Sequence, residues 1–251
     1  MKSLSFWVSS LLMALSMTSL APHAGAVLLD LTTVGSSGTI GDGMFFQADP
    51  QPTGTGYINS FLRVQMNGSE QGYNTDGRLE FDEKKGNYTR SLRVDEVPVV
   101  NINGTNYREF ILDINERHRG DDSLLSLDQL QIWLEGASDL TDYSTNFSNL
   151  IYDLDATADN WLLFDYSLNH GSGSGDMFAY IDDSLFAGPN DYVYLFSRFG
   201  DHNSSDAGFE EWAVREGGRD PVIPEPATVA LMSMGLAGLG FIKRRRKALQ
   251  S

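Results

Sequence analysis

The chain has 251 residues and a formal net charge of −16 at pH 7, with four histidines and no cysteine. Without cysteine, disulfides, thiol catalysis and Cys-ligated zinc are excluded. The excess of negative charge repels the phosphate backbone, which excludes DNA and RNA as partners. Cations, including calcium, are the natural counter-species of such a chain.

The N-terminus has the three parts of a secretory signal peptide. Lys2 supplies positive charge, residues 4–20 form an apolar run, and Ala24-Gly25-Ala26 provides small residues for cleavage. We therefore expect residues 1–26 to be removed and the mature protein to begin at Val27. An uncleaved N-terminal anchor is the alternative.

The C-terminus also has three parts: the triplet Pro224, Glu225 and Pro226, an uncharged run over residues 227–242, and the cations Lys243, Arg244, Arg245, Arg246 and Lys247. As a helix, the uncharged run spans about 24 Å, slightly less than the roughly 30 Å hydrocarbon core of a membrane. We expect a single transmembrane helix at 227–242 that anchors the chain only marginally. The basic tail at 243–247 holds its own side in the cytoplasm. The triplet then faces outward, where its two prolines keep it extended.

The order of triplet, apolar run and basic tail resembles the PEP-CTERM sorting signal, over residues 222–251. The resemblance implies export, a transient anchor in the inner membrane, and processing near the triplet by the transpeptidase-like enzyme exosortase. It also implies a final position at the cell surface or outside the cell. A plain C-terminal membrane anchor is the alternative.

Residues 27–221, between the two signals, are long enough for one passenger domain with its own core. Six of the eighteen cations lie in the signals, so the passenger is more acidic than the whole chain. The expected organisation is therefore a signal peptide at 1–26, a passenger domain at 27–221 and a sorting signal at 222–251.

Short apolar runs separated by Gly, Asn and Asp indicate that the passenger is built from strands. Asn103-Gly104 fits a hairpin turn, and residues 78–81 and 88–94 alternate like a second hairpin across 84–87. Residues 124–134 have a helical alternative, because their leucines also fit helical spacing. The pattern predicts an all-β fold, an antiparallel β-sandwich or jelly roll. The expected strands lie at 57–66, 97–102, 107–114, 125–134, 161–168, 177–181 and 192–199.

Two of these runs, at 110–115 and 125–134, resemble paired strands of β-sandwich passengers of PEP-CTERM proteins. Residues 169–186, 192–200 and 208–212 resemble a block that a subset of those passengers shares. These resemblances imply a fold and a sorting class, but no activity.

A weak metal-binding pattern lies in residues 153–160. Asp153, Asp155 and Asp159 stand at alternate positions, as in calcium loops, but Ala158 and Phe164 occupy the places of the EF-hand Gly and Glu. The three aspartates are candidate calcium ligands, with a solvated turn as the alternative. No other cofactor is expected.

The sequence contains no recognisable catalytic constellation. Glu210 and Glu211 beside Trp212 would suit a glycosidase, but adjacent residues of a strand point to opposite faces. We expect no catalytic residue and no enzyme activity.

His118, His170 and His202 lie in polar or Gly-rich surroundings, where solvated loop histidines are expected. The sequence therefore predicts an exported, non-catalytic surface or extracellular protein, associated with exopolysaccharide and the biofilm matrix as the family context implies. A secreted carbohydrate-active enzyme or carbohydrate-binding protein is the alternative.

Overall fold

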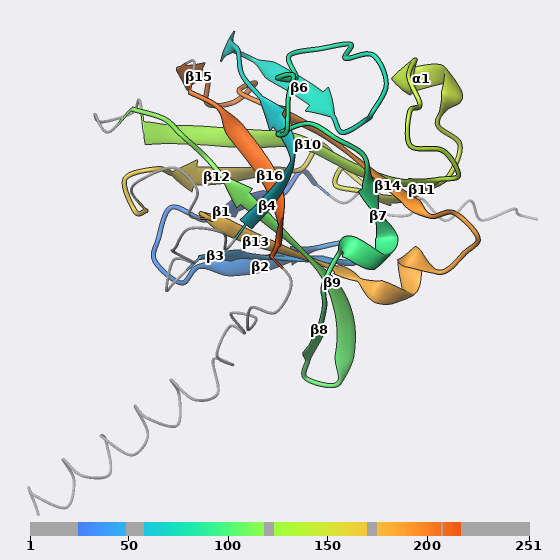
Figure 1. The fold of residues 1–251 in the computed structure, drawn as a ribbon. Coiled ribbons are helices and arrows are strands. Elements are labelled where there is room, and N and C mark those ends of the chain that lie inside the picture. The colour runs from blue at the N-terminus through green and yellow to red at the C-terminus, as the bar shows by residue number, and fades with distance from the viewer. Residues whose placement is uncertain (1–24, 49–57, 118–122, 170–174, 207, 217–251) are drawn as a thin grey trace, which may run out of the picture.

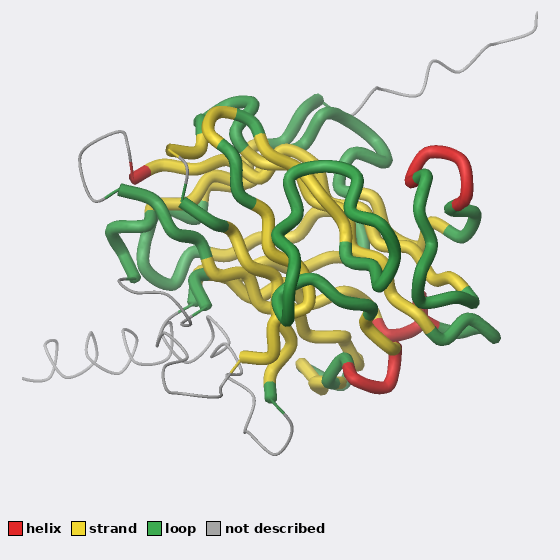
Figure 2. The backbone as a smooth tube through the Cα atoms, turned by 45° about the horizontal axis from the view of Figure 1, so that its top comes forward, coloured by secondary structure: helices red, strands yellow, loops and turns green. Residues whose placement is uncertain are grey.

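The computed structural model describes residues 25–48, 58–117, 123–169, 175–206 and 208–216. These residues form two sheets of seven strands, drawn in Figure 1, that enclose a shared apolar core. Figure 2 shows that strands predominate and that helices are confined to short segments. The expected all-β class is confirmed, and the architecture is sandwich-like.

The first sheet contains the longest strand, and three other strands pair with it. Its main path runs β1-β12-β10-β14-β6, while β11 pairs with β10 and β7 pairs with β14. All its pairs are antiparallel except β1 with β12. The bounds are β1 (Leu28–Asp30), β6 (Glu70–Tyr73), β7 (Leu92–Arg93), β10 (Leu124–Glu135), β11 (Leu150–Asp153), β12 (Trp161–Asp165) and β14 (Tyr192–Phe199).

The second sheet runs β2-β3-β13-β9-β16-β4, with β8 added on β9, and all its pairs are antiparallel. A two-stranded ribbon pairs β5 with β15. The bounds are β2 (Ser37–Ile40), β3 (Gly43–Gln47), β4 (Ile58–Val64), β5 (Asn67–Gly68), β8 (Val99–Ile102), β9 (Thr105–Asp113), β13 (Met177–Asp182), β15 (Ser205–Asp206) and β16 (Glu210–Arg215). The helical segments are η1 (Val94–Glu96), α1 (Tyr143–Asn146) and η3 (Asp183–Phe186).

Strand β10 changes the parity of its core-facing side chains halfway along its length. Leu125 and Leu127 lie in the core before the change, and three even-numbered residues, Leu130, Ile132 and Leu134, lie in it afterwards. The change occurs at a β-bulge, where Leu127 pairs with Phe199 but Gln129 pairs with Arg198. Asp128 is the extra residue, left out of the ladder. The strand prediction for this segment is confirmed.

The hairpin predicted between 78–81 and 88–94 is wrong. Residues 74–91 form an irregular segment between β6 and β7, and their pairing is limited to one isolated bridge from Glu83 to Val64. The other hairpin prediction is confirmed, because Asn103 and Gly104 adopt φ of 53° and 92° between β8 and β9.

Several predictions concern parts of the chain that are not described. The signal peptide, apart from its last two residues, and the transmembrane helix at 227–242 lie outside the described residues. Within the described ranges, no helix is long and apolar enough to cross a membrane.

The interior contains carboxyl groups as well as apolar side chains. Glu109 has no exposed surface and is paired with Arg215, whose Nε lies 2.7 Å from its carboxylate. Glu70 is equally buried, but its carboxylate accepts the main-chain N–H of Met66. Burial raises the pKa of Glu70 to about 8. Glu70 is therefore mostly protonated in the folded protein at neutral pH.

We expect the free energy of unfolding to fall as the pH rises from about 4.5 to about 8. The unfolded chain loses the Glu70 proton near the ordinary pKa of 4.5, whereas the folded chain keeps it up to about 8. Glu70→Gln should flatten this decline by on the order of 1 kcal/mol per pH unit. Urea unfolding of the full-length chain in detergent, repeated across this pH range, measures the slope.

Asp182→Asn is the matched control for this experiment. Hydrogen bonds from Ser184 lower the pKa of Asp182, so its contribution to stability is lost only at more acidic pH. In the Asp182→Asn protein, the free energy of unfolding should therefore change with pH between 4.5 and 8 as it does in the wild type. A Glu70→Gln protein with that same slope would show that Glu70 is not buried in its protonated form.

Candidate functional site

A cavity of about 660 Å³ opens beside the irregular segment 74–91. Figure 1 shows this segment as the connection between β6 and β7. The volume of the cavity falls in the range of roughly 300–1,000 Å³ that small-molecule sites occupy. All of its lining residues come from this segment except Asn59, which belongs to β4. Strand β4 of the second sheet therefore borders the cavity, and the segment supplies the other lining residues.

Asp76 holds the two ends of the segment together. Its carboxylate accepts hydrogen bonds from the N–H and the hydroxyl of Ser91, both at 2.8 Å, and its own N–H donates to the carbonyl of Ser138 at 3.0 Å. Partial burial raises the pKa of Asp76, but the hydrogen bonds outweigh it and leave the pKa below its ordinary value. At Gly77, a Cβ atom would lie 2.5 Å from the carbonyl oxygen of Asp139, so only glycine allows this close approach.

Glu83 organises the middle of the segment. Its side chain is buried, and its carboxylate accepts the N–H groups of Tyr73 at 3.1 Å, Glu80 at 3.2 Å and Phe81 at 2.8 Å. Burial raises the pKa of Glu83 despite these bonds. The backbone thus wraps around a carboxylate, which fixes residues 80–83 between the two stretches of the cavity lining, 75–79 and 85–90, before any ligand arrives.

The cavity lining is polar, and its charged groups are mostly cations. Leu79 is the single apolar side chain among the lining residues. The polar members are the amides Asn59 and Asn87, the hydroxyls Thr75 and Thr89, the cations Arg78, Lys85 and Arg90, and the carboxylate Asp76. An arrangement of this kind suits a ligand rich in hydroxyl groups that also carries negative charge.

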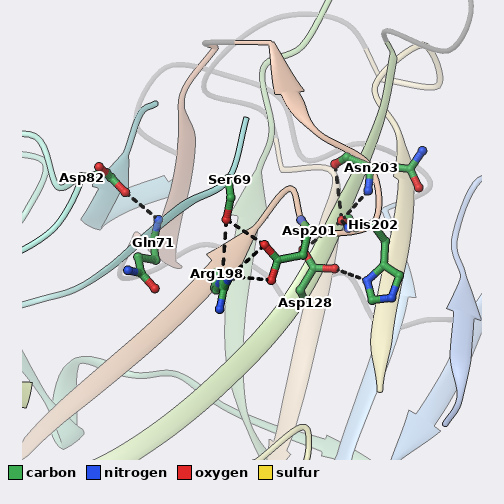
Figure 3. A network of polar contacts seen from close by, with 9 residues as sticks. Ser69, Gln71, Asp82, Asp128, Arg198, Asp201, His202 and Asn203 are labelled. Carbon is green, nitrogen blue, oxygen red and sulfur yellow. Dashed lines mark hydrogen bonds and ion pairs between the residues drawn. The ribbon is translucent and has the colours of Figure 1, made fainter. Parts of the chain in front are cut away.

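A second polar network, shown in Figure 3, surrounds the bulge residue Asp128. Its buried carboxylate accepts the Ser126 hydroxyl at 2.9 Å and the N–H of Asp201 at 2.7 Å, and lies 2.6 Å from Nδ1 of His202. The His202 ring stacks on Trp161, with ring centroids 4.2 Å apart and planes 2° from parallel. His202 lies in a loop and is exposed, as expected, and its ring is also held by contacts with Asp128 and Trp161.

This network resembles a catalytic Asp-His pair only in part. In a serine triad the hydroxyl bonds to the histidine, whereas here Ser126 donates to Asp128. The Ser126 oxygen also accepts the N–H groups of His202 and Asn203, at 3.2 and 2.9 Å. These contacts fasten the turn after β14 to β10, so the network positions backbone rather than a nucleophile.

The calcium candidates lie at and after the end of β11. Asp153 accepts the N–H of Asp155 at 3.0 Å and Nε2 of Gln131 at 3.1 Å, and Asp155 accepts the N–H of Asn160 at 2.8 Å. Burial, followed by the charges of Asp153 and Asp159, raises the pKa of Asp155 to about 6. Across the described ranges, no three Asp, Glu or His side chains are grouped to hold a metal ion. The calcium site stays a prediction.

Most of the other residues singled out in the sequence lie outside the part of the chain that the structure describes. The sorting residues at 224–226 and 243–247 lie outside the described residues, as do His118 and His170. Glu210 and Glu211 are both buried, and Glu211 pairs with Arg63. The expected absence of a paired glycosidase site at these adjacent residues stays a prediction.

The sequence reasoning missed the cavity because it assigned its residues to a hairpin. One signal was present: four cations, Arg78, Lys84, Lys85 and Arg90, fall within thirteen residues of a strongly acidic passenger. The carboxylates that fold the segment, Asp76 and Glu83, carry no such signal.

Comparison with known protein families assigns the C-terminus. Residues 222–247 match the family model of the PEP-CTERM protein-sorting motif. The chain therefore carries a PEP-CTERM sorting domain. The motif indicates an exported protein that is targeted to exosortase and passes through a membrane-anchored intermediate. Searches of curated proteins and of solved structures found no match to the chain.

We expect Asp128→Ala to lower the free energy of unfolding by roughly 2–4 kcal/mol, because it leaves the buried Ser126 hydroxyl and two part-buried donors, from Asp201 and His202, without their acceptor. Asp201→Ala is the control, since its carboxylate pairs with Arg198 near the surface and should cost less than about 1 kcal/mol. Chemical denaturation at neutral pH measures both values. Equal losses in the two variants would contradict the anchoring role of Asp128.

If Asp155 binds calcium, calcium should raise the Tm of the full-length chain in detergent at constant ionic strength, where magnesium does little. Calcium accepts about six to eight flexible oxygen ligands, whereas magnesium requires a near-octahedral shell. Asp155→Asn should then remove most of the shift. Equal shifts from calcium, magnesium and matched sodium chloride would show that charge screening alone acts.

Proposed function

We propose that this chain is an exosortase-processed surface or extracellular protein whose passenger is non-catalytic and binds exopolysaccharide in the biofilm matrix. The observation that carries the proposal is the PEP-CTERM motif at residues 222–247. Within that motif, Pro224, Glu225 and Pro226 form the processing site, and the cations at 243–247 hold the anchor in the inner membrane.

The polar cavity beside the segment 74–91 supports a binding role. Its lining presents amide and hydroxyl groups, and its walls are fixed by Asp76 and Glu83. When the residues around a cavity are already ordered, binding a ligand costs little conformational entropy. The site is therefore suited to hold a hydroxyl-rich ligand, as an extracellular glycan is.

The geometry of Asp128 and His202 supports a role without catalysis. The nearby hydroxyl of Ser126 bonds to the carboxylate and not to the imidazole, so it is not activated as a nucleophile. The alternative, a secreted carbohydrate-active enzyme, differs in one measurable property. An enzyme shortens the polysaccharide it binds, whereas the proposed protein leaves its length unchanged.

Replacing Pro224, Glu225 and Pro226 by alanine should leave a full-length species in the inner membrane of the producing bacterium. The two prolines are expected to keep the triplet out of regular helix and sheet, and so accessible to the processing enzyme. Mass spectrometry of membrane and extracellular fractions identifies the C-terminus of each species.

Deleting residues 243–247 is the matched comparison, because it removes the cytoplasmic charge and keeps the triplet. It should weaken retention and orientation in the membrane, so the two variants should fail differently. Normal processing of the alanine variant would refute the role assigned to the triplet.

A further inference from the structure

We propose that the cavity beside residues 74–91 binds a carboxylated oligosaccharide, with the ammonium group of Lys85 recognising a sugar carboxylate. This inference rests on the proposed function, because it names the chemical class of the ligand for the same passenger.

The uncharged part of the lining suits sugar hydroxyl groups. The Thr75 hydroxyl donates to the carbonyl of Leu140 at 2.8 Å, and the Thr89 hydroxyl accepts the N–H of Arg63 at 3.3 Å. Both hydroxyls are therefore fixed in place. The Thr75 oxygen also accepts the N–H of Gly77 at 2.9 Å, whereas the Thr89 hydroxyl keeps its proton available to donate. No aromatic side chain is among the lining residues, so a nucleobase or other flat aromatic ligand finds no ring to stack on.

The arginines of the cavity are already neutralised by carboxylates. Arg78 lies 2.9 Å from Glu80, and Arg90 lies 2.9 Å from Glu96. The same holds for every arginine in the described part of the chain, each of which forms an ion pair. These guanidinium groups help to shape the wall, and each already has a carboxylate partner within the protein.

Lys85 differs from all of them. It is exposed, lines the cavity, and its ammonium group has no carboxylate partner among the described residues. The neighbouring Lys84 is close enough to Glu70 to lower the pKa of that carboxyl, and it is not part of the lining. Lys85 is thus a cation with its charge still available, placed among groups that bind hydroxyls.

A carboxylated sugar satisfies both features at once. Its carboxylate completes the missing ion pair of Lys85, and its hydroxyls meet the amides and hydroxyls of the lining. An acidic passenger repels anions over most of its surface. An anionic glycan therefore needs a local cation such as Lys85 in order to bind. Because the rest of the surface is acidic, it repels the glycan and restricts binding to the cavity.

The test is isothermal titration calorimetry of the full-length chain in detergent at low ionic strength. The probes are trigalacturonate, its neutral methyl ester and inorganic phosphate. We expect trigalacturonate to bind and its methyl ester to bind about fivefold more weakly, because a partly exposed ion pair contributes about 1 kcal/mol. Phosphate should not displace the sugar, since it lacks the hydroxyl contacts.

Two variants and one control locate the site. Lys85→Gln should weaken trigalacturonate binding about fivefold and remove the preference over the ester, whereas Lys84→Gln should stay within about twofold of wild type. Asn87→Trp, which fills the cavity from an exposed loop position, should abolish binding of both sugars. Circular dichroism confirms that each variant keeps the β fold.

Three results would overturn the proposal: no binding of trigalacturonate, equal binding of the acid and the ester, or equal effects of Lys84→Gln and Lys85→Gln. Displacement by phosphate would assign the cavity to a free anion instead. A chain that is processed normally at its C-terminus but does not bind sugar would refute this inference alone. Failure of processing would refute the proposed sorting and leave the binding result to stand.

Discussion

The β-bulge in β10 is the constraint on which both the core and the loops above it depend. A strand with uninterrupted alternation would bury Leu125 and Leu127 and turn Leu130 and Ile132 away from the core. The extra residue at Asp128 restores the apolar face, so leucine and isoleucine side chains on both sides of the bulge are fully buried. Each such side chain contributes about 1.5–3 kcal/mol to folding. Strand β10 can therefore pair with β11, β12 and β14 while it keeps its apolar side chains in the core.

The same bulge determines what lies at the end of the sheet. Asp128 is freed from the ladder, and its carboxylate accepts donors from the turn that follows β14. Carboxylates perform this task repeatedly in the protein, since Asp76 and Glu83 fold the segment beside the cavity in the same way. An acidic chain without disulfides thus uses part of its negative charge as internal acceptors for backbone N–H groups. Arginine ion pairs offset other carboxylates, and Lys85 is left to face solvent in the cavity.

Much of the fold was predictable from the sequence, because alternation over several residues reports a two-sided strand. The strand at 58–64 follows from that alternation, and the strands at 99–102, 105–113 and 192–199 follow from short apolar runs between turn residues. Residues 124–134 left a helical alternative open, and the structure explains why. The parity change at the bulge spaces Leu127, Leu130 and Leu134 by three and four residues, which imitates a helix.

The cavity was not predictable for a different reason. Residues 78–81 and 88–94 alternate like strands. However, the buried Glu83 carboxylate accepts the N–H groups of Tyr73, Glu80 and Phe81, which are then not available for hydrogen bonds between strands. The bond between Asp76 and Ser91 joins residues fifteen positions apart, and no local pattern reports it. The sorting motif, by contrast, is carried by local sequence alone, so it was recognisable without a structure.

We infer that residues 74–91 form a rigid wall of the cavity and not a flexible connection between strands. Native-state hydrogen exchange measures this directly. The amides of Asp76, Arg90 and Ser91 donate to Ser138, Phe61 and Asp76, so we predict that they exchange almost as slowly as the amides of β10. Exchange of these three amides as fast as that of an unstructured peptide would contradict the claim.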